Sequence, residues 1–230
     1  MNNWYTKLYD HRFELFLGIQ LCTLFGSLVI PITFFDSIVL PILYSISTGL
    51  GVIIVSKNKK IMWFCIGLFS LSLLLFGGDQ VSPDSWSNEY LLARISVYFI
   101  INIFVTLSII KQVWHEQKVD RKVILGLISG YIALGFLGFF LFISIDLTHE
   151  NAFTGLLIDN GENFKFHADS LLYYSFITLL TIGYGEIIPA IPVAQKAAIL
   201  VGLIGQIYLT IVTAIIVSKY INHSVFKSDN

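Results

Sequence analysis

The chain has 230 residues, of which 56% are hydrophobic and 13% are charged, and its formal net charge is −1. This composition excludes intrinsic disorder, collagen and coiled coil, and it argues against a soluble globular domain. A total charge so close to neutral also argues against a nucleic acid as a partner. We therefore expect a membrane protein, with lipid as the solvent for most of the chain.

Six long apolar runs follow one another along the sequence. Each is close to the roughly 20 residues that a helix needs to cross a bilayer. Lipid permits only helices or closed barrels, and runs of this length without alternation are not barrel strands. The sequence thus predicts an all-α membrane protein whose six transmembrane helices cover residues 13–30, 38–55, 61–76, 91–110, 123–145 and 193–218.

The basic residues are divided unevenly between the loops. Six spans place both termini on one side, and that side carries 11 of the 14 lysines and arginines. Because cytoplasmic loops are enriched in Lys and Arg, this side is predicted to face the cytoplasm. The opposite loops carry 10 of the 15 acidic residues. We expect a multi-pass protein of a cell membrane, such as a bacterial inner membrane, with both termini cytoplasmic and an acidic outer face.

A shorter apolar run, 171–180, lies between the fifth and sixth long runs. Ten residues of helix reach about 15 Å, half a bilayer, so this segment is predicted to enter the membrane and return to the same side. Asp169 or Ser170 is predicted to cap its start. The sequence Thr-Ile-Gly-Tyr-Gly-Glu follows at 181–186. Non-helical backbone at membrane depth is tolerated only inside protein or along a water-filled path, which predicts a pore.

The residues around this turn resemble the potassium-channel signature T-x-x-T-x-G-Y-G, which is matched by Thr178, Thr181 and the Gly-Tyr-Gly sequence at 183–185. The resemblance extends over 123–221 and implies an outer helix, a re-entrant pore helix, a selectivity filter and an inner helix. It implies a passive, potassium-selective channel whose backbone carbonyls replace the hydration shell of K⁺. K⁺ would be the permeant ion, and no cofactor is expected. Because one chain supplies a quarter of such a ring, the resemblance implies a homotetramer surrounded by membrane lipids.

The resemblance also assigns roles to individual residues. The carbonyls of the first four filter residues, with the hydroxyl of Thr181, would coordinate K⁺. Glycine at two filter positions permits the positive φ that turns successive carbonyls toward one axis. The Tyr184 ring would pack against the pore helix, where paired aromatic residues hold the width of the filter. The assigned filter residues are Thr181, Ile182, Gly183, Tyr184 and Gly185, and the assigned support residues are Thr178, Tyr173, Tyr174 and Glu186.

Three positions depart from the family pattern. Glu186 stands where the family usually has aspartate, so the hydrogen bond from this position to the pore helix is not assured by the resemblance. Leu180 occupies a position that is often threonine, and Ile177 one where some members have a carboxylate. We expect altered stability or inactivation of the filter, with selectivity retained. Two alternatives remain: a non-selective cation channel with the same pore, and a non-conducting pore-like subunit of a transporter or regulatory complex.

The predicted inner helix carries candidates for gating. Gly205 lies 20 residues after Gly185, where the family has its hinge glycine; close helix packing is an equal alternative. Gln206 is predicted to make a hydrogen bond between helices rather than to contact ions. The resemblance would place Thr213 and Val217 toward the cavity and the cytoplasmic constriction.

The basic stretch between the fourth and fifth runs is a break in composition that suggests how the chain is organised. We predict a four-helix membrane region of unknown role at 1–112, a cytoplasmic linker at 113–122, the pore module at 123–221 and a short cytoplasmic tail at 222–230.

The fourth predicted span contains one arginine, Arg94, rather than the repeated arginines of a voltage sensor. We therefore expect weak or absent voltage gating by this helix. No nucleophile–base arrangement, metal-ligand cluster or phosphate-binding loop is recognisable in the sequence, so we do not expect an enzyme.

Overall fold

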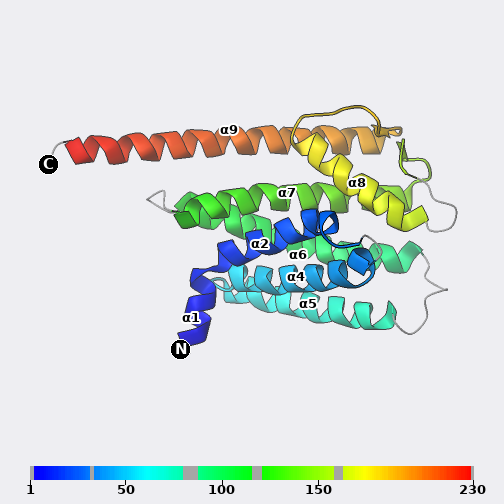
Figure 1. Cartoon of the computed structure of the whole chain (residues 1–230), viewed down its shortest axis with the longest axis horizontal. Helices are drawn as coiled ribbons and strands as arrows, with labels where there is room; N and C mark the ends of the chain where they lie inside the picture. Colours follow the sequence, from blue (N-terminus) through cyan, green and yellow to red (C-terminus); the bar gives the residue numbers. More distant parts are fainter. Residues whose placement is uncertain (1–2, 32–33, 80–87, 116–120, 158–162, 229–230) are drawn as a thin grey trace. The chain divides into compact units, whose positions relative to one another are not determined.

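The computed structural model describes residues 3–31, 34–79, 88–115, 121–157 and 163–228, and most of them are helical (Figure 1). The elements in chain order are α1 (Asn3–Asp10), α2 (Arg12–Phe25), the 3-10 helix η1 (Gly26–Leu28), the π-helix η2 (Phe35–Val39), α4 (Leu40–Val55), α5 (Lys59–Asp79), α6 (Asn88–His115), α7 (Arg121–Thr148), β1 (Phe153–Thr154), α8 (Asn163–Leu179), β2 (Ile188–Pro189) and α9 (Pro192–Ser228).

The chain divides into two compact units. The first comprises Met1–Ser82 with Ile100–Ala133, and the second comprises Pro83–Phe99 with Leu134–Asn230. Helices α6 and α7 each contribute to both units. The domain boundaries predicted from sequence remain a prediction.

Three described helices are long and apolar enough to cross a membrane: Leu91–His115, Arg121–Thr148 and Pro192–Ala214. They coincide with the predicted fourth, fifth and sixth spans. In the first predicted span, α2 ends at Phe25, and the Phe35 ring lies where a Cβ of Gly26 would be. Because glycine has no Cβ, η2 can approach the end of α2 closely at this point. The first three predicted spans remain predictions.

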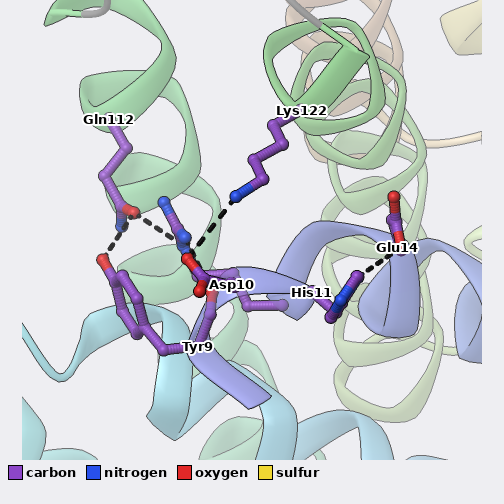
Figure 2. A network of polar contacts seen from close by, with 7 residues as sticks. Tyr9, Asp10, His11, Glu14, Gln112 and Lys122 are labelled. Carbon is purple, nitrogen blue, oxygen red and sulfur yellow. Dashed lines mark hydrogen bonds and ion pairs between the residues drawn. The ribbon is translucent and has the colours of Figure 1, made fainter. Parts of the chain in front are cut away.

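In the first unit, a polar network joins the start of α2 to the end of α6 (Figure 2). The side-chain carbonyl of Gln112 accepts hydrogen bonds from the Tyr9 hydroxyl at 3.3 Å and from Arg12 Nε at 3.1 Å. The Gln112 amide nitrogen donates to the Ile54 carbonyl of α4 at 2.8 Å. The Arg12 guanidinium also lies 4.0 Å from the centroid of the Tyr9 ring. Gln112 therefore connects three elements of this unit, and the buried Arg12 charge has polar and aromatic partners.

Ion pairs surround this network at the helix ends. Lys122 Nζ lies 3.4 Å from an Asp10 carboxylate oxygen, and His11 Nδ1 lies 2.7 Å from a Glu14 oxygen (Figure 2). Arg121 Nε lies 3.7 Å from the other Glu14 oxygen. Basic residues that the sequence assigned to one side thus lie together within the first unit. The side of a membrane that they face remains a prediction.

In the second unit, α8 packs closely against α7 and α9. The buried Ser175 hydroxyl donates to the Gly135 carbonyl of α7 at 2.6 Å. A Cβ on Gly135 would overlap the Phe176 ring, and a Cβ on Gly138 would overlap the Ser175 hydroxyl. Two glycines of α7 therefore allow α8 to approach its backbone.

An aromatic cluster joins α7, β1 and α8. The Tyr174 ring lies 4.9 Å from the Phe142 ring and 5.6 Å from the Phe153 ring, measured between centroids. Phe142 and Phe153 are themselves 5.6 Å apart in an edge-to-face arrangement. Such pairs stabilise beyond the area that they bury, by about 0.5–1.5 kcal/mol each. The cluster holds α8 against the strand that precedes it.

We expect Ser175→Ala to lower the free energy of unfolding by about 1 kcal/mol, because a buried hydrogen bond between two helices is lost. The measurement is thermal unfolding of the purified protein in detergent. Ser144→Ala is the matched control, because the Ser144 hydroxyl donates to the Phe140 carbonyl of its own helix at 2.7 Å. An equal effect of the two substitutions would contradict the role given to Ser175.

Candidate functional site

Helix α8 begins well before the apolar run that predicted it. It spans Asn163–Leu179, so Asp169 and Ser170 lie inside the helix and the prediction that either caps its start was wrong. The polar residues ahead of the apolar run are helical too. The prediction missed them because hydropathy reports burial and does not mark helix ends. The Ser170 hydroxyl instead accepts a hydrogen bond from the Leu157 N–H at 3.2 Å.

A histidine–carboxylate pair connects the start of α8 to the end of α7. His167 Nδ1 lies 2.8 Å from an Asp146 oxygen, and both side chains are largely buried. No pattern in the sequence predicts this pair. Only the folded chain brings these residues together, since 20 residues separate them in sequence.

The C-terminal end of α8 is closed by a pair of backbone hydrogen bonds. The Ile182 N–H donates to the Ile177 carbonyl at 2.9 Å, and the Thr181 N–H donates to the Thr178 carbonyl at 3.0 Å. This is the Schellman pattern, whose C′ residue is left-handed and usually glycine. Here that residue is Thr181, with φ of 57°. Left-handed backbone costs a non-glycine residue about 1–2 kcal/mol, so the fold holds Thr181 in a strained conformation.

Beyond this cap, positive φ recurs at every second residue. The values are 57° at Thr181, 57° at Gly183 and 91° at Gly185, whereas Ile182 and Tyr184 are not among the positive-φ residues. The predicted positive φ of the two glycines is therefore confirmed. A Cβ on either glycine would meet no atom within 4 Å. Glycine is thus favoured here by the backbone conformation and not by a lack of space.

The segment after the filter residues is held by a two-stranded antiparallel sheet. Phe153 pairs with Pro189 and Thr154 with Ile188, and the Ala190 N–H donates to the Ala152 carbonyl at 2.9 Å. Residues 152–154 thus support the backbone that follows residues 181–186.

Gly155 is a functional candidate that sequence reasoning missed. Its φ is 83°, and a Cβ at this position would overlap the Glu186 carbonyl. The end of β1 therefore touches the backbone directly after the filter glycines. A lone glycine between Thr154 and Leu156 was the available signal, but its contact lies 31 positions away in sequence.

Tyr173 of α8 and Glu186 form the hydrogen bond that the resemblance did not assure. A hydrogen bond to the Glu186 carboxylate raises the pKa of Tyr173 to about 12. The hydroxyl therefore stays protonated and donates at physiological pH. The longer glutamate side chain thus keeps a hydrogen bond to α8.

The other support residues lie in different environments. Tyr174 is buried in the aromatic cluster and hydrogen-bonds to Thr178, one turn further along α8. Tyr184 is 74% exposed, so its ring has few contacts within the chain. All six residues of 181–186 are exposed. Packing of Tyr184 against a pore helix remains a prediction.

Gly205 lies where α9 passes the end of α8. A Cβ on Gly205 would overlap the Leu179 carbonyl, whereas one on Gly202 would lie 3.8 Å from the Thr178 carbonyl, an ordinary contact. This geometry favours the close-packing interpretation of Gly205 over a hinge. Thr213 is exposed, with its hydroxyl on the Leu209 carbonyl at 2.8 Å.

The predictions for Gln206 and Val217 in α9 are not tested by the structure. Gln206 is exposed, and its predicted hydrogen bond between helices remains a prediction. Val217 lies in the part of α9 whose side chains fall outside the description.

We expect Gly205→Ala to destabilise the protein by about 1–3 kcal/mol, because the methyl group must displace a backbone carbonyl that cannot rotate away. Gly202→Ala is the matched control in the same helix, and it should be neutral or slightly stabilising because alanine favours helix. Thermal unfolding in detergent compares the two. If Gly205→Ala kept wild-type stability, the close-packing interpretation would fail.

The pKa of Tyr173 generates a second prediction. Because this pKa is raised from 10.0 to about 12, the stabilisation is complete below about pH 10 and is lost as the pH rises toward 12. The tyrosinate absorbance of wild type minus that of Tyr173→Phe should therefore titrate late. Glu186→Gln should move this titration back toward pH 10, because the charged acceptor is gone. A difference curve centred at 10 in the wild type would contradict the hydrogen bond.

Comparison with known proteins bears on the same region. No curated protein and no solved structure matched the chain. A family model described as an ion channel matches residues 126–222. The matched range begins in α7 and includes α8, the filter residues and most of α9. Residues 126–222 are therefore similar in sequence to an ion channel.

Proposed function

We propose that this chain is a subunit of a potassium-selective channel that conducts K⁺ passively through backbone carbonyls of 181–185. One observation carries the proposal: positive φ at Thr181, Gly183 and Gly185, directly after the closed end of α8. In backbone that alternates between right- and left-handed residues, the N–H groups gather on one face, which leaves the carbonyl oxygens to the other. A row of carbonyl oxygens suits a dehydrated K⁺ ion.

Helix α8 supports this proposal electrostatically. Its C-terminal end leads directly into Thr181, and the C-terminus of a helix carries partial negative charge. That end would favour a cation next to the first filter residue. Glu186 keeps a carboxylate at the other end of the segment, and its tyrosine partner is neutral. Repeated around a central axis, this carboxylate would raise the local cation concentration at the mouth.

The exposure of the filter residues supports a homotetramer. Irregular backbone at membrane depth must be buried in protein or line a water-filled path, yet residues 181–186 are exposed in the single chain. Helix α9 is 17% buried over its most apolar window, against 61% for α7. We propose that further copies of the chain cover part of this surface and that membrane lipids cover the rest. The exposed Tyr184 ring would then contact the neighbouring copy.

The two alternatives make different predictions for transport. A non-selective cation channel would retain flux but pass K⁺ and Na⁺ equally, because Leu180 and Glu186 would loosen the filter. A non-conducting subunit would assemble without passing either ion. Reversal potentials in mixed K⁺ and Na⁺, measured on purified protein in liposomes, separate all three.

We expect Gly183→Ala to abolish or strongly degrade K⁺ selectivity. The added Cβ has room, so the effect would come from φ alone, at about 1–2 kcal/mol in each subunit. Gly18→Ala is the matched control, because Gly18 also has nothing within 4 Å but lies in helix α2. The control should conduct as wild type does. Tyr184→Ala tests the support of the filter separately and should also degrade selectivity.

Equal K⁺ and Na⁺ permeability of the wild-type protein would refute potassium selectivity. Absence of flux from a protein that still assembles would favour the non-conducting alternative. Unchanged selectivity in Gly183→Ala would refute the role proposed for positive φ in the filter.

A further inference from the structure

A pocket of about 500 Å³ lies within the first unit between the end of α4, the start of α5 and the last turns of α6. Three lysines line it. Lys57 lies in the connection between α4 and α5, Lys59 is the first residue of α5, and Lys111 lies in α6. His115 also lines it. The described residues of its wall include no carboxylate. This basic pocket is therefore built to receive an anion.

The wall of the basic pocket is held in place before any ligand arrives. Gln112, one of its lining residues, accepts hydrogen bonds from Tyr9 and Arg12 and donates one to the Ile54 carbonyl. Figure 2 shows Gln112 beside Tyr9. Lys57 Nζ lies 5.8 Å from the centroid of the Tyr9 ring, which belongs to the same network. Binding would therefore need little reorganisation of the wall, which favours affinity.

Backbone charge at the basic pocket also favours an anion. The start of α5, with its partial positive charge, opens onto it, and Asn58 caps that end by accepting from the Lys60 N–H at 3.2 Å. The last carbonyls of α4 would oppose an anion, but they have partners. Val55 accepts from the Asn58 N–H at 3.0 Å, and Ile54 accepts from Gln112 at 2.8 Å. The start of α5 therefore adds its partial positive charge to that of the three lysines.

Two tryptophans indicate the depth of the basic pocket in a membrane. Trp63 in the first turns of α5 and Trp114 in the last turn of α6 are 68% and 57% exposed. Tryptophan is enriched at the level of lipid headgroups, and both residues lie on the helices that form the pocket. We propose that the basic pocket binds a phosphate group, supplied by the headgroup of an anionic membrane phospholipid.

The test uses native mass spectrometry of the full chain in detergent, with phosphatidylglycerol and with phosphatidylcholine as probes. We expect wild type to retain phosphatidylglycerol preferentially. Lys57→Gln combined with Lys111→Gln should lower its affinity roughly tenfold or more, because each lysine near an anionic surface contributes strongly. Lys60→Gln combined with Lys122→Gln removes the same charge outside the pocket wall and should retain wild-type binding.

A smaller pair of variants guards against misfolding of the double substitutions. These variants are Lys59→Gln and Lys60→Gln. Lys59 and Lys60 are adjacent and both exposed, but only Lys59 lines the basic pocket. Only Lys59→Gln should weaken binding of phosphatidylglycerol, by about fivefold. Equal loss in pocket and control variants, or no loss in either, would overturn the proposal, since general charge attraction or no site at all would explain it.

A parallel arm identifies the source of the phosphate. Inorganic phosphate is titrated into the same protein, and its effect on thermal unfolding is recorded with and without phosphatidylglycerol. A lipid site predicts little stabilisation by inorganic phosphate. A different result would overturn the lipid as the source of the phosphate. In that result, inorganic phosphate stabilises the wild type but not the variant with both Lys57→Gln and Lys111→Gln, and the wild type shows no preference for phosphatidylglycerol.

Discussion

The left-handed backbone of Thr181 is the constraint on which the rest of the second unit depends. A helix of ordinary residues that ended with glycine would close without strain, but here a β-branched residue takes that place. The strain persists only because surrounding structure holds both sides of the turn. The same residue ends α8 and begins the alternation of φ that continues to Gly185. The end of α8 and the backbone geometry of 181–185 are therefore set by the same residue.

The supports of this turn come from elements on every side of it within the second unit. Ser175 fixes α8 to the backbone of α7, and Gly205 brings α9 against the last carbonyl of α8. Gly155 and the β1–β2 pair hold the chain where it leaves the filter. The Ser175 hydroxyl and two glycines, Gly155 and Gly205, thus control the position of a short irregular segment, because each lies where two parts of the chain approach closely. Close packing transmits such constraints because protein interiors leave little free volume.

The two units use polar side chains for different purposes. In the first, Gln112 and Arg12 join helix ends beside a basic pocket, whose described lining residues include three lysines and no carboxylate. In the second, Tyr173 and Glu186 join α8 to the segment after the filter.

The sequence by itself determined the membrane character, the apolar helices from α6 to α9, and the positions of the two glycines in segment 181–186, because hydropathy and backbone permissiveness are local properties of residues. Only the tertiary structure decided the strain at Thr181, the contact of Gly155 with Glu186, the buried position of Gly205 and the true start of α8. Each of these depends on a partner that is remote in sequence or on a hydrogen bond that no local pattern specifies. The aromatic character of Tyr174 was equally visible in the sequence, but its partners Phe142 and Phe153 became known only when three elements packed together.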